Sequence, residues 1–327
     1  MLAPTVDILM YHSISRASGP TSISPEVFAR QIAQLVVSNL PVLRMDEVAA
    51  HLAQGHGRAV AITFDDGLED FRQNAWPILR PHGFRPMVYL PTECIGGNEI
   101  WAGAHVPPRP LMSWDGAREL AAEGVDFGNH SACHDDLSCL DPRAAAEDID
   151  RACARFAAEL GQPPAHFAPP YGHSTPAVRC LIGERHRTSV GTVLATADAR
   201  SDPFDLPRIE MHYFRAPDRW DRHLSGDGVL YLTLRRKLRA VRRAVWSRGN
   251  LKRARSWSGC TLAHCPAFGT ISACHRTQCL VRQLLPLNWS AVPLTSRVLR
   301  GMPGGGRSIC GVSAASPSQR RWSHIGR

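Results

Sequence analysis

The sequence predicts an α/β fold built on a parallel sheet, and a (β/α) barrel of seven or so units is the arrangement that fits it. Short apolar segments alternate with longer segments of helical periodicity over the first two thirds of the 327 residues. Six or seven such units in roughly 220 residues are close to the lower size limit of α/β barrels. An open, doubly wound sheet is the competing arrangement. In both, functional side chains collect at the C-terminal ends of the strands.

Six short apolar runs are predicted to be the strands. The first, residues 6–11 (VDILMY), ends abruptly in Tyr11-His12-Ser13, which places a histidine at the tip of the first strand. Polar, glycine or proline residues follow the other runs, as is usual where a strand ends. These runs cover residues 59–64, 86–90, 125–130, 165–168 and 188–193.

The helices between the strands have recognisable start and stop residues. Ser24 can cap a helix that has proline at its first position, and Asp141-Pro142 opens another that ends at Gly161. Helical segments are predicted over residues 25–39, 114–124, 142–161 and 175–184, and after the second strand up to residue 82.

The net charge of +9 does not describe the folded part of the chain. All 29 acidic residues precede residue 228, whereas the last 100 residues hold sixteen arginines, two lysines and no acidic residue. The first part therefore has the composition of a slightly acidic globular domain, for which no nucleic-acid partner is expected. We predict that this domain comprises residues 1–247.

Residues 248–327 form an irregular basic tail without hydrophobic periodicity, and we interpret it as disordered or as translated out of frame. Its C-x4-C-x8-C-x4-C spacing, from Cys260 to Cys279, does not match a common zinc module. The preceding stretch 229–246 has the pattern of a basic amphipathic helix. Such a helix could close the domain or lie on an anionic membrane surface.

The cellular location is predicted from features that the sequence lacks. The N-terminus has no positive segment or cleavage pattern of a secretory signal, and no run has the ~18 to 20 apolar residues of a membrane span. The cysteines before residue 228 are odd in number and have no framework spacing, so we expect free thiols. Together these features predict a cytoplasmic protein.

Two polar clusters at predicted strand ends have the residue types of a metal centre. Asp65 and Asp66 follow the second strand directly, and adjacent carboxylates both stay ionised only beside a cation or hydrogen-bond donors. His130 and His134 end the fourth strand and can bind one ion if the backbone turns toward it. With Asp66 they make a three-ligand site with open positions, which is typical of catalytic zinc. Asp65 would then accept a proton from water beside the ion.

A third cluster, Phe167 to Gly172 (FAPPYG), follows the fifth strand. Its two prolines, aromatic residue and glycine predict a rigid wall, and the amide of Tyr171 could point at a developing oxyanion. Taken singly, each of the three clusters is more typical of a turn or loop. Their shared position at strand ends indicates a site.

The motifs TFDDG, HSACH and FAPPYG, in this order, resemble the first three motifs of the polysaccharide deacetylases (the NodB-homology family, carbohydrate esterase family 4). The resemblance covers about residues 5–225. It implies a deformed (β/α) barrel and metal-dependent removal of acetyl groups from an N-acetylated glycan, with Zn²⁺ as the expected ion. By resemblance, Asp65 is the general base, Tyr171 the backbone oxyanion donor, and the metal ligands are Asp66, His130 and His134.

Two departures from the family pattern concern the base and the acid. Many members carry an arginine in the third motif that orients the base; this chain has Ala168 there, and Arg208 is the candidate replacement. No clean copy of the family's C-terminal acid histidine is present, and His212 and His223 are the nearest. In the poly-N-acetylglucosamine deacetylase branch, which this sequence resembles, the acid histidine follows the first strand. His12 is therefore the candidate general acid.

These roles together describe the hydrolysis of an acetamide. The ion would bind water and the acetyl carbonyl, Asp65 would take the proton of the water, and His12 would protonate the departing amine. Three tryptophans are candidates for stacking on sugar rings, although at least one is expected in the core: Trp101, Trp114 and Trp220.

Two other functions would use the same residues. Two histidines and one carboxylate also form the facial triad of non-haem iron oxygenases. The second carboxylate, Asp65, argues against that function because hydrolysis needs a base there and oxygen activation does not. The absent arginine of the third motif also fits a catalytically inactive carbohydrate-binding relative. The sequence indicates neither the glycan nor the oligomeric state.

Overall fold

The structure is a computed structural model that describes residues 3–228 and 230–239. The predictions for residues 248–327, and for the part of the amphipathic segment 229–246 that follows residue 239, lie outside the described residues. Residues 230–239 are helical, as the amphipathic pattern predicts. Within the described ranges, no helix combines the length and the apolar character needed to cross a membrane.

Seven parallel strands form a closed barrel, which confirms the predicted fold class and excludes the open sheet. β1 (Thr5–Tyr11) pairs along its whole length with β5 (Arg58–Phe64) and, on its other side, with β11 (Leu206–Glu210). These two pairings close the ring. The remaining strands follow sequence order from β5 to β11: β6 (Met87–Leu90), β7 (Asp126–Asn129), β8 (His166–Phe167) and β9 (Thr188–Leu194).

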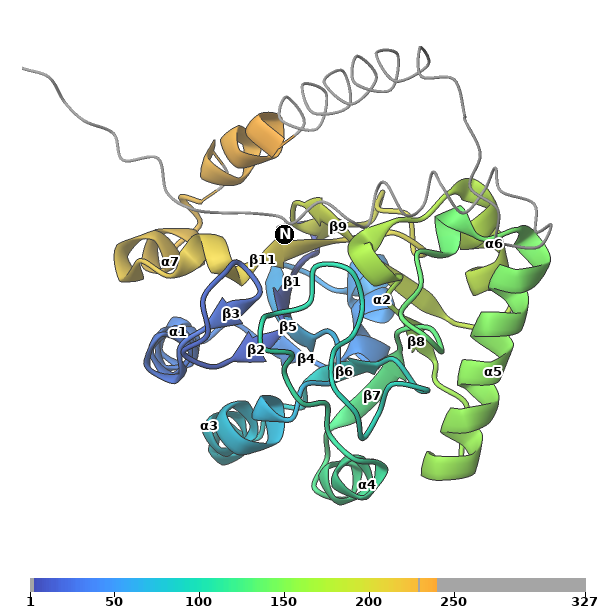
Figure 1. The fold of residues 1–327 in the computed structure, drawn as a ribbon. Helices are drawn as coiled ribbons and strands as arrows, with labels where there is room; N and C mark the ends of the chain where they lie inside the picture. The colour runs from blue at the N-terminus through green and yellow to red at the C-terminus, as the bar shows by residue number, and fades with distance from the viewer. Residues whose placement is uncertain (1–2, 229, 240–327) are drawn as a thin grey trace, which may run out of the picture. The chain divides into compact units, whose positions relative to one another are not determined.

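Helices surround this ring of strands, as Figure 1 shows. The predicted helices are present as α1 (Pro25–Ser38), α4 (Trp114–Ala122), α5 (Pro142–Leu160) and α6 (Pro176–Gly183). The segment predicted up to residue 82 consists of a π-helical turn (Phe71–Ala75), α3 (Trp76–Leu79) and a 3-10 turn (Arg80–His82). α7 (Pro217–Leu224) follows the barrel, and the short strands are β2 (Ser13–Ile14), β3 (Ser22–Ile23), β4 (Val42–Leu43) and β10 (Ala197–Asp198).

One helix that was not predicted, α2 (Met45–Gln54), covers the end of the barrel at which the strands begin. Arg44 binds Asp126 at the start of β7, with Nε 2.8 Å from Oδ2, and Asp46 accepts a hydrogen bond from His166 of β8 at 2.9 Å. Apolar residues of α2 pack on the strand residues that fill the barrel. The opposite end, where the strands finish, is therefore the end left for a site.

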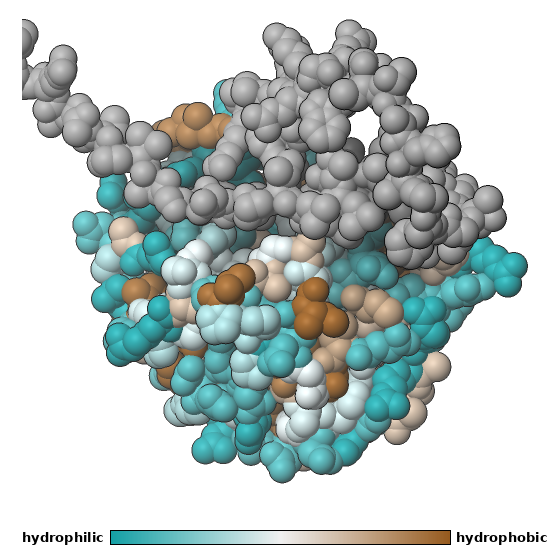
Figure 2. Space-filling view, viewed as in Figure 1, coloured by the Kyte–Doolittle hydropathy of each residue, from teal (hydrophilic) through white to brown (hydrophobic). Residues whose placement is uncertain are grey.

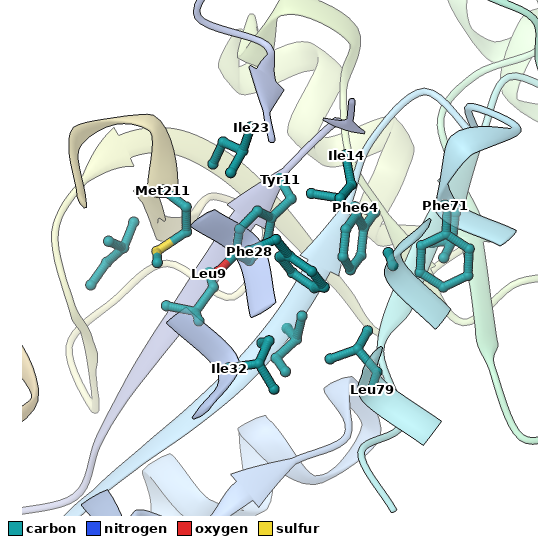
Figure 3. Packing of buried hydrophobic residues seen from close by; sticks show 14 of the residues in the cluster. Leu9, Tyr11, Ile14, Ile23, Phe28, Ile32, Phe64, Phe71, Leu79 and Met211 are labelled. Carbon is teal, nitrogen blue, oxygen red and sulfur yellow. The ribbon is translucent and has the colours of Figure 1, made fainter. Parts of the chain in front are cut away.

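An aromatic cluster joins the barrel to α1. The ring of Tyr11 stacks on that of Phe64 at 5.2 Å and meets the edge of Phe28 at 5.1 Å (Figure 3). The Tyr11 hydroxyl donates to the side-chain oxygen of Gln31, and the backbone carbonyl oxygen of Gln31 accepts a hydrogen bond from the indole N–H of Trp220 at 3.0 Å. Trp220 is fully buried in this contact. It is therefore a core residue and not a platform for a sugar, which corrects one of the sequence-based candidates.

The alternate residues of the strands fill the inside of the barrel. Val6 and Ile8 of β1 belong to this inner core. Because successive side chains of a strand point to opposite faces, the inward row of β1 continues toward His12 beyond the end of the strand. The corresponding rows of β5 and β11 reach Asp65 and Arg208. The alternation of three neighbouring strands thus brings three polar side chains to one rim.

A buried ion pair joins β1, β5 and α7 on the outer side of the barrel. Asp7 is fully buried, and its carboxylate accepts hydrogen bonds from Arg58 Nε at 2.7 Å, His223 Nε2 at 2.9 Å and Thr196 Oγ1 at 2.6 Å. Burial alone would raise the pKa of Asp7, but the hydrogen bond and charge of His223 and the charge of Arg58 outweigh it, so this pKa is lowered.

We expect Asp7→Asn to destabilise the fold by about 3 kcal/mol at neutral pH, because removing one partner leaves the Arg58 charge poorly compensated. The pKa of Asp7 is lowered by folding, so its stabilising contribution is present above the ordinary pKa of aspartate and is lost as the pH falls through the folded value. Urea unfolding of both proteins between pH 7 and pH 3 should show the stability difference narrowing in acid. A difference independent of pH would contradict this assignment.

Candidate active site

Side chains from the ends of several strands meet at one rim of the barrel, as their position in the sequence predicts. The seven sequence-predicted residues form two groups that adjoin through the neighbours Asp65 and Asp66. The first group contains Asp66, His130, His134 and, at its edge, Tyr171. The second contains Asp65, Arg208 and His12.

The first group has the composition and geometry of a metal site. Oδ1 of Asp66 lies 3.4 Å from Nε2 of His130 and 3.3 Å from Nε2 of His134, and the three candidate ligand atoms are all within 4.8 Å of one another. All three residues are buried. His130 Nδ1 donates to the carbonyl oxygen of Ala168 at 2.6 Å, and this contact orients the ring so that its Nε2 faces Asp66. Metal-binding histidines are typically oriented by such a hydrogen bond.

The charges within this group compensate one another. Burial would raise the pKa of Asp66, but hydrogen bonds from His130 and His134 hold it well below its ordinary value. Burial would lower the pKa of His130, and the adjacent carboxylates outweigh that effect and raise it. Burial lowers the pKa of His134, which favours the neutral imidazole that a metal requires. The three residues therefore fit a divalent cation.

The backbone around this group is held in an uncommon conformation. Asp66, Ser131, His134 and Tyr171 have φ angles of 74°, 68°, 60° and 60°, in the left-handed region that non-glycine residues rarely adopt. Such conformations persist where surrounding contacts impose them. In the histidine loop, Ser131 N–H donates to Asn129 Oδ1 at 2.8 Å and Ser131 Oγ accepts from His134 N–H at 2.9 Å. These turns aim the side chains into the site.

Arg208 forms a bidentate ion pair with Asp65 through two parallel hydrogen bonds. Nη1 and Nη2 lie 2.7 Å from the two carboxylate oxygens, and both residues are buried. Nε of Arg208 donates to the Gly191 carbonyl oxygen at 2.8 Å, which fixes the guanidinium plane. Burial would raise the pKa of Asp65, but the charge and hydrogen bonds of Arg208 outweigh it, so this pKa is lowered. Asp65 is therefore ionised at neutral pH.

His12 also lies near Asp65. Its Nε2 is 4.0 Å from Asp65 Oδ2, too long for a hydrogen bond, and its side chain is 17% exposed. The two alternative histidines lie elsewhere: His223 binds Asp7 on the outside of the barrel, and His212 is half-buried in the turn after β11, beside Arg215 and Arg235. Among the described ion pairs, His12 is the one of these three histidines that faces Asp65.

Aromatic rings border the candidate ligands. Trp101 stacks on the His134 ring at 4.0 Å, and the Tyr171 ring meets His134 edge-on at 5.0 Å. Of the tryptophans proposed to contact sugar, Trp101 thus borders the site. Trp114 packs edge-on against Phe156 of α5 and belongs to the packing between helices.

One contact at this rim has no signal in the sequence motifs. Asp136 accepts a hydrogen bond from His173 Nδ1 at 2.7 Å, and Asp136 is buried. The pair joins the loop of His134 to the loop of Tyr171, because each partner lies two residues beyond a candidate site residue. That shared offset was visible in the sequence, but only the fold brings the two loops together.

We expect the chain to bind one Zn²⁺ per molecule through the first group, with a rise in melting temperature. His134→Ala should weaken binding by more than the 10- to 100-fold of a typical outer-sphere change. His173→Ala, which removes a nearby half-exposed histidine, should retain most of the affinity. Isothermal titration of the metal-stripped proteins measures the Zn²⁺ affinity of the wild type and of each variant. Equal affinity in wild type and His134→Ala would exclude this site.

Comparison with known proteins agrees with the geometry of the barrel. Residues 53–185 match the family model for polysaccharide deacetylase. A Bacillus subtilis (strain 168) protein, "Putative polysaccharide deacetylase YxkH", is 27% identical over 145 residues, which are 43% of this chain and 48% of that protein. A second, "Uncharacterized protein YlxY" of the same strain, is 34% identical over 82 residues, a quarter of each chain. The matches thus span half or less of these relatives.

Two solved structures share the fold. Deacetylase PplD of Streptococcus pyogenes, in complex with acetate, superposes with a TM-score of 0.56 at 22% identity, over 63% of this chain and 92% of that one. IcaB from Ammonifex degensii gives a TM-score of 0.54 at 23% identity, over 70% and 99% of the two chains.

Proposed function

Because residues 53–185 match the family model for polysaccharide deacetylase, we propose that this protein is a metal-dependent hydrolase that removes acetyl groups from N-acetylated sugars. The observation that carries the proposal is the pair of adjacent carboxylates with separate partners. Asp66 faces two histidines, whereas Asp65 is gripped by Arg208 beside them. One carboxylate for a metal and one for a proton is what amide hydrolysis needs.

The first group would hold the metal, and two imidazoles with one carboxylate favour Zn²⁺. When bound, a divalent ion supplies positive charge that polarises the acetyl carbonyl and lowers the pKa of water. Buried Asp66, His130 and His134 keep that charge in a partly dry environment, where its effect is greater than in water.

Asp65 would act as the general base. Arg208 keeps it ionised and fixes its orientation, so its oxygens are available to take a proton from the attacking water. His12, 4.0 Å away and partly exposed, would serve as the general acid. The backbone N–H of Tyr171, in a left-handed turn at the same rim, would donate to the oxyanion.

The step balances with these groups alone. The water oxygen bonds to the acetyl carbon while its proton passes to Asp65. The carbon–nitrogen bond then breaks, and the departing nitrogen takes a proton from His12. The products are acetic acid, which loses its remaining proton to solvent and becomes acetate, and a free amine on the sugar. The proton on Asp65 then returns to His12.

Neither alternative gains support from a specific contact. An inactive relative would lack an arginine that orients the base, and the Arg208–Asp65 ion pair supports our proposal that Arg208 of β11 has this role. An oxygen-activating iron site has no use for the Asp65–Arg208 pair next to its ligands. The cytoplasmic location stays a prediction.

We expect the full chain, loaded with zinc, to release acetate from N-acetylglucosamine oligomers. Asp65→Asn and His12→Ala should each lower kcat by about 10²- to 10⁴-fold, the usual worth of a general base or acid. His212→Ala is the matched histidine control and should retain activity. Normal acetate release by His12→Ala would assign the proton donor elsewhere, and no release by the wild type would reject these substrates.

Replacing Arg208 should move the pH profile in a defined direction. Arg208→Met removes the charge that lowers the pKa of Asp65, so that pKa should rise and the acid limb of kcat/KM should shift to higher pH. Arg208→Lys should keep part of the lowering of the Asp65 pKa, because lysine retains the positive charge but cannot form the paired hydrogen bonds. A pH profile that is lower but unshifted in Arg208→Met would mean that Arg208 supports only the fold.

A further inference from the structure

The helix at residues 230–239 carries a row of leucines on its outer face. Leu230, Leu234 and Leu238 are 83%, 57% and 53% exposed. A spacing of four residues places them on one side of a helix. Burying these side chains would remove a substantial apolar area from water, so their joint exposure indicates an interaction surface.

The other face of the same helix is fixed to the domain. Leu232 is buried in the core, and the Tyr231 hydroxyl donates to the Tyr213 carbonyl oxygen at 3.2 Å. The Arg235 guanidinium lies over the Tyr213 and Tyr231 rings at 5.0 and 5.4 Å. The helix is therefore anchored by one side, and its leucine row points away from the barrel.

This row differs from the rest of the described surface. The other exposed large apolar residues are valines and one isoleucine at scattered positions: Val36, Val37, Ile100, Val106 and Val193. Figure 2 shows a hydrophobic group where this helix lies in Figure 1, and separate hydrophobic groups among the hydrophilic residues of the face below it.

The charge around the row identifies the partner. Arg236 and Lys237 are exposed on this helix, and the sequence continues with Arg239, Arg242 and Arg243. No acidic residue occurs from residue 228 onward. A second copy docking through the same row would bring two cationic helices together without compensating charge, which disfavours self-association. An anionic lipid surface supplies both the apolar layer and the opposite charge.

We propose that helix 230–239 binds the surface of an anionic bilayer, with its leucine row buried among the upper acyl chains and its cationic side chains at the phosphates. In this arrangement the helix lies parallel to the bilayer surface, within the interface. Leucine insertion and charge attraction act together, so binding requires both.

The test compares the full chain with Leu234→Asn/Leu238→Asn in sedimentation with vesicles. One vesicle set is phosphatidylcholine, and the other contains phosphatidylglycerol. The double variant keeps every charge, so attraction by the basic residues is equal in both proteins. We expect wild type to sediment with the anionic vesicles and the variant to partition about tenfold less, because two apolar side chains are lost from the insertion. Val37→Asn, which replaces an exposed residue of α1, is the matched surface control and should bind as wild type.

Three results would overturn the proposal. Equal sedimentation of wild type and the double variant would mean that charge alone attracts lipid. Absence of wild-type binding to anionic vesicles would reject the membrane. A dimer of the wild type that the double variant cannot form, measured by light scattering without lipid, would make a second copy the partner. Acetate release from soluble oligomers should be the same in all variants, which separates this test from that of the proposed function.

Discussion

The site depends on the closure of the barrel through β1. This strand pairs with β5 on one side and with β11 on the other, although β11 lies about two hundred residues further along the chain. His12 directly follows β1, Asp65 directly follows β5, and Arg208 lies within β11, so the closure brings these three side chains together. Without the closing pairs, Asp65 would have no guanidinium beside it, and a buried carboxylate without a partner is unfavourable.

Two adjacent carboxylates acquire different environments because the chain turns between them. Asp65 continues the inward row of β5 and meets Arg208, whereas the left-handed φ of 74° at Asp66 directs it to the two imidazoles. The glycine that follows accommodates the same turn. The turn at Asp66 thus gives two chemically identical carboxylates different partners: an arginine compensates the charge of Asp65, and two histidines compensate that of Asp66. Different environments of this kind are how proteins give identical groups separate acid and base roles.

Much of the fold followed from local pattern, and the exceptions have physical reasons. The six predicted runs are strands in the structure because each is short, contains mostly apolar, β-branched or aromatic residues, and lies between polar, glycine or proline residues. β11 was missed because Pro207 and Arg208 interrupt its short apolar run, and the partner that compensates the buried charge of Arg208, Asp65, lies far away in the sequence. α2 was missed because Arg44, which is not a typical capping residue, precedes it; the carboxylate of Glu47 accepts a hydrogen bond from the backbone N–H of Arg44 at 2.7 Å. The position of the site could be predicted because functional side chains collect at the C-terminal ends of the strands. The Asp136–His173 hydrogen bond could not be predicted, because it joins two loops that only the fold brings together.

The origin of Arg208 in the last strand of the barrel has a consequence for how the protein is made. Strands β1 to β9 leave the ribosome first, and they bring Asp65 toward the barrel interior before its counter-ion has been synthesised. Until β11 emerges, the nascent barrel has an open seam between β9 and β1 and a carboxylate that favours hydration over burial. Completion of the seam and neutralisation of that charge are one event. The nascent chain therefore gains its final strand, its buried ion pair and its chemically competent rim in the same step of biosynthesis.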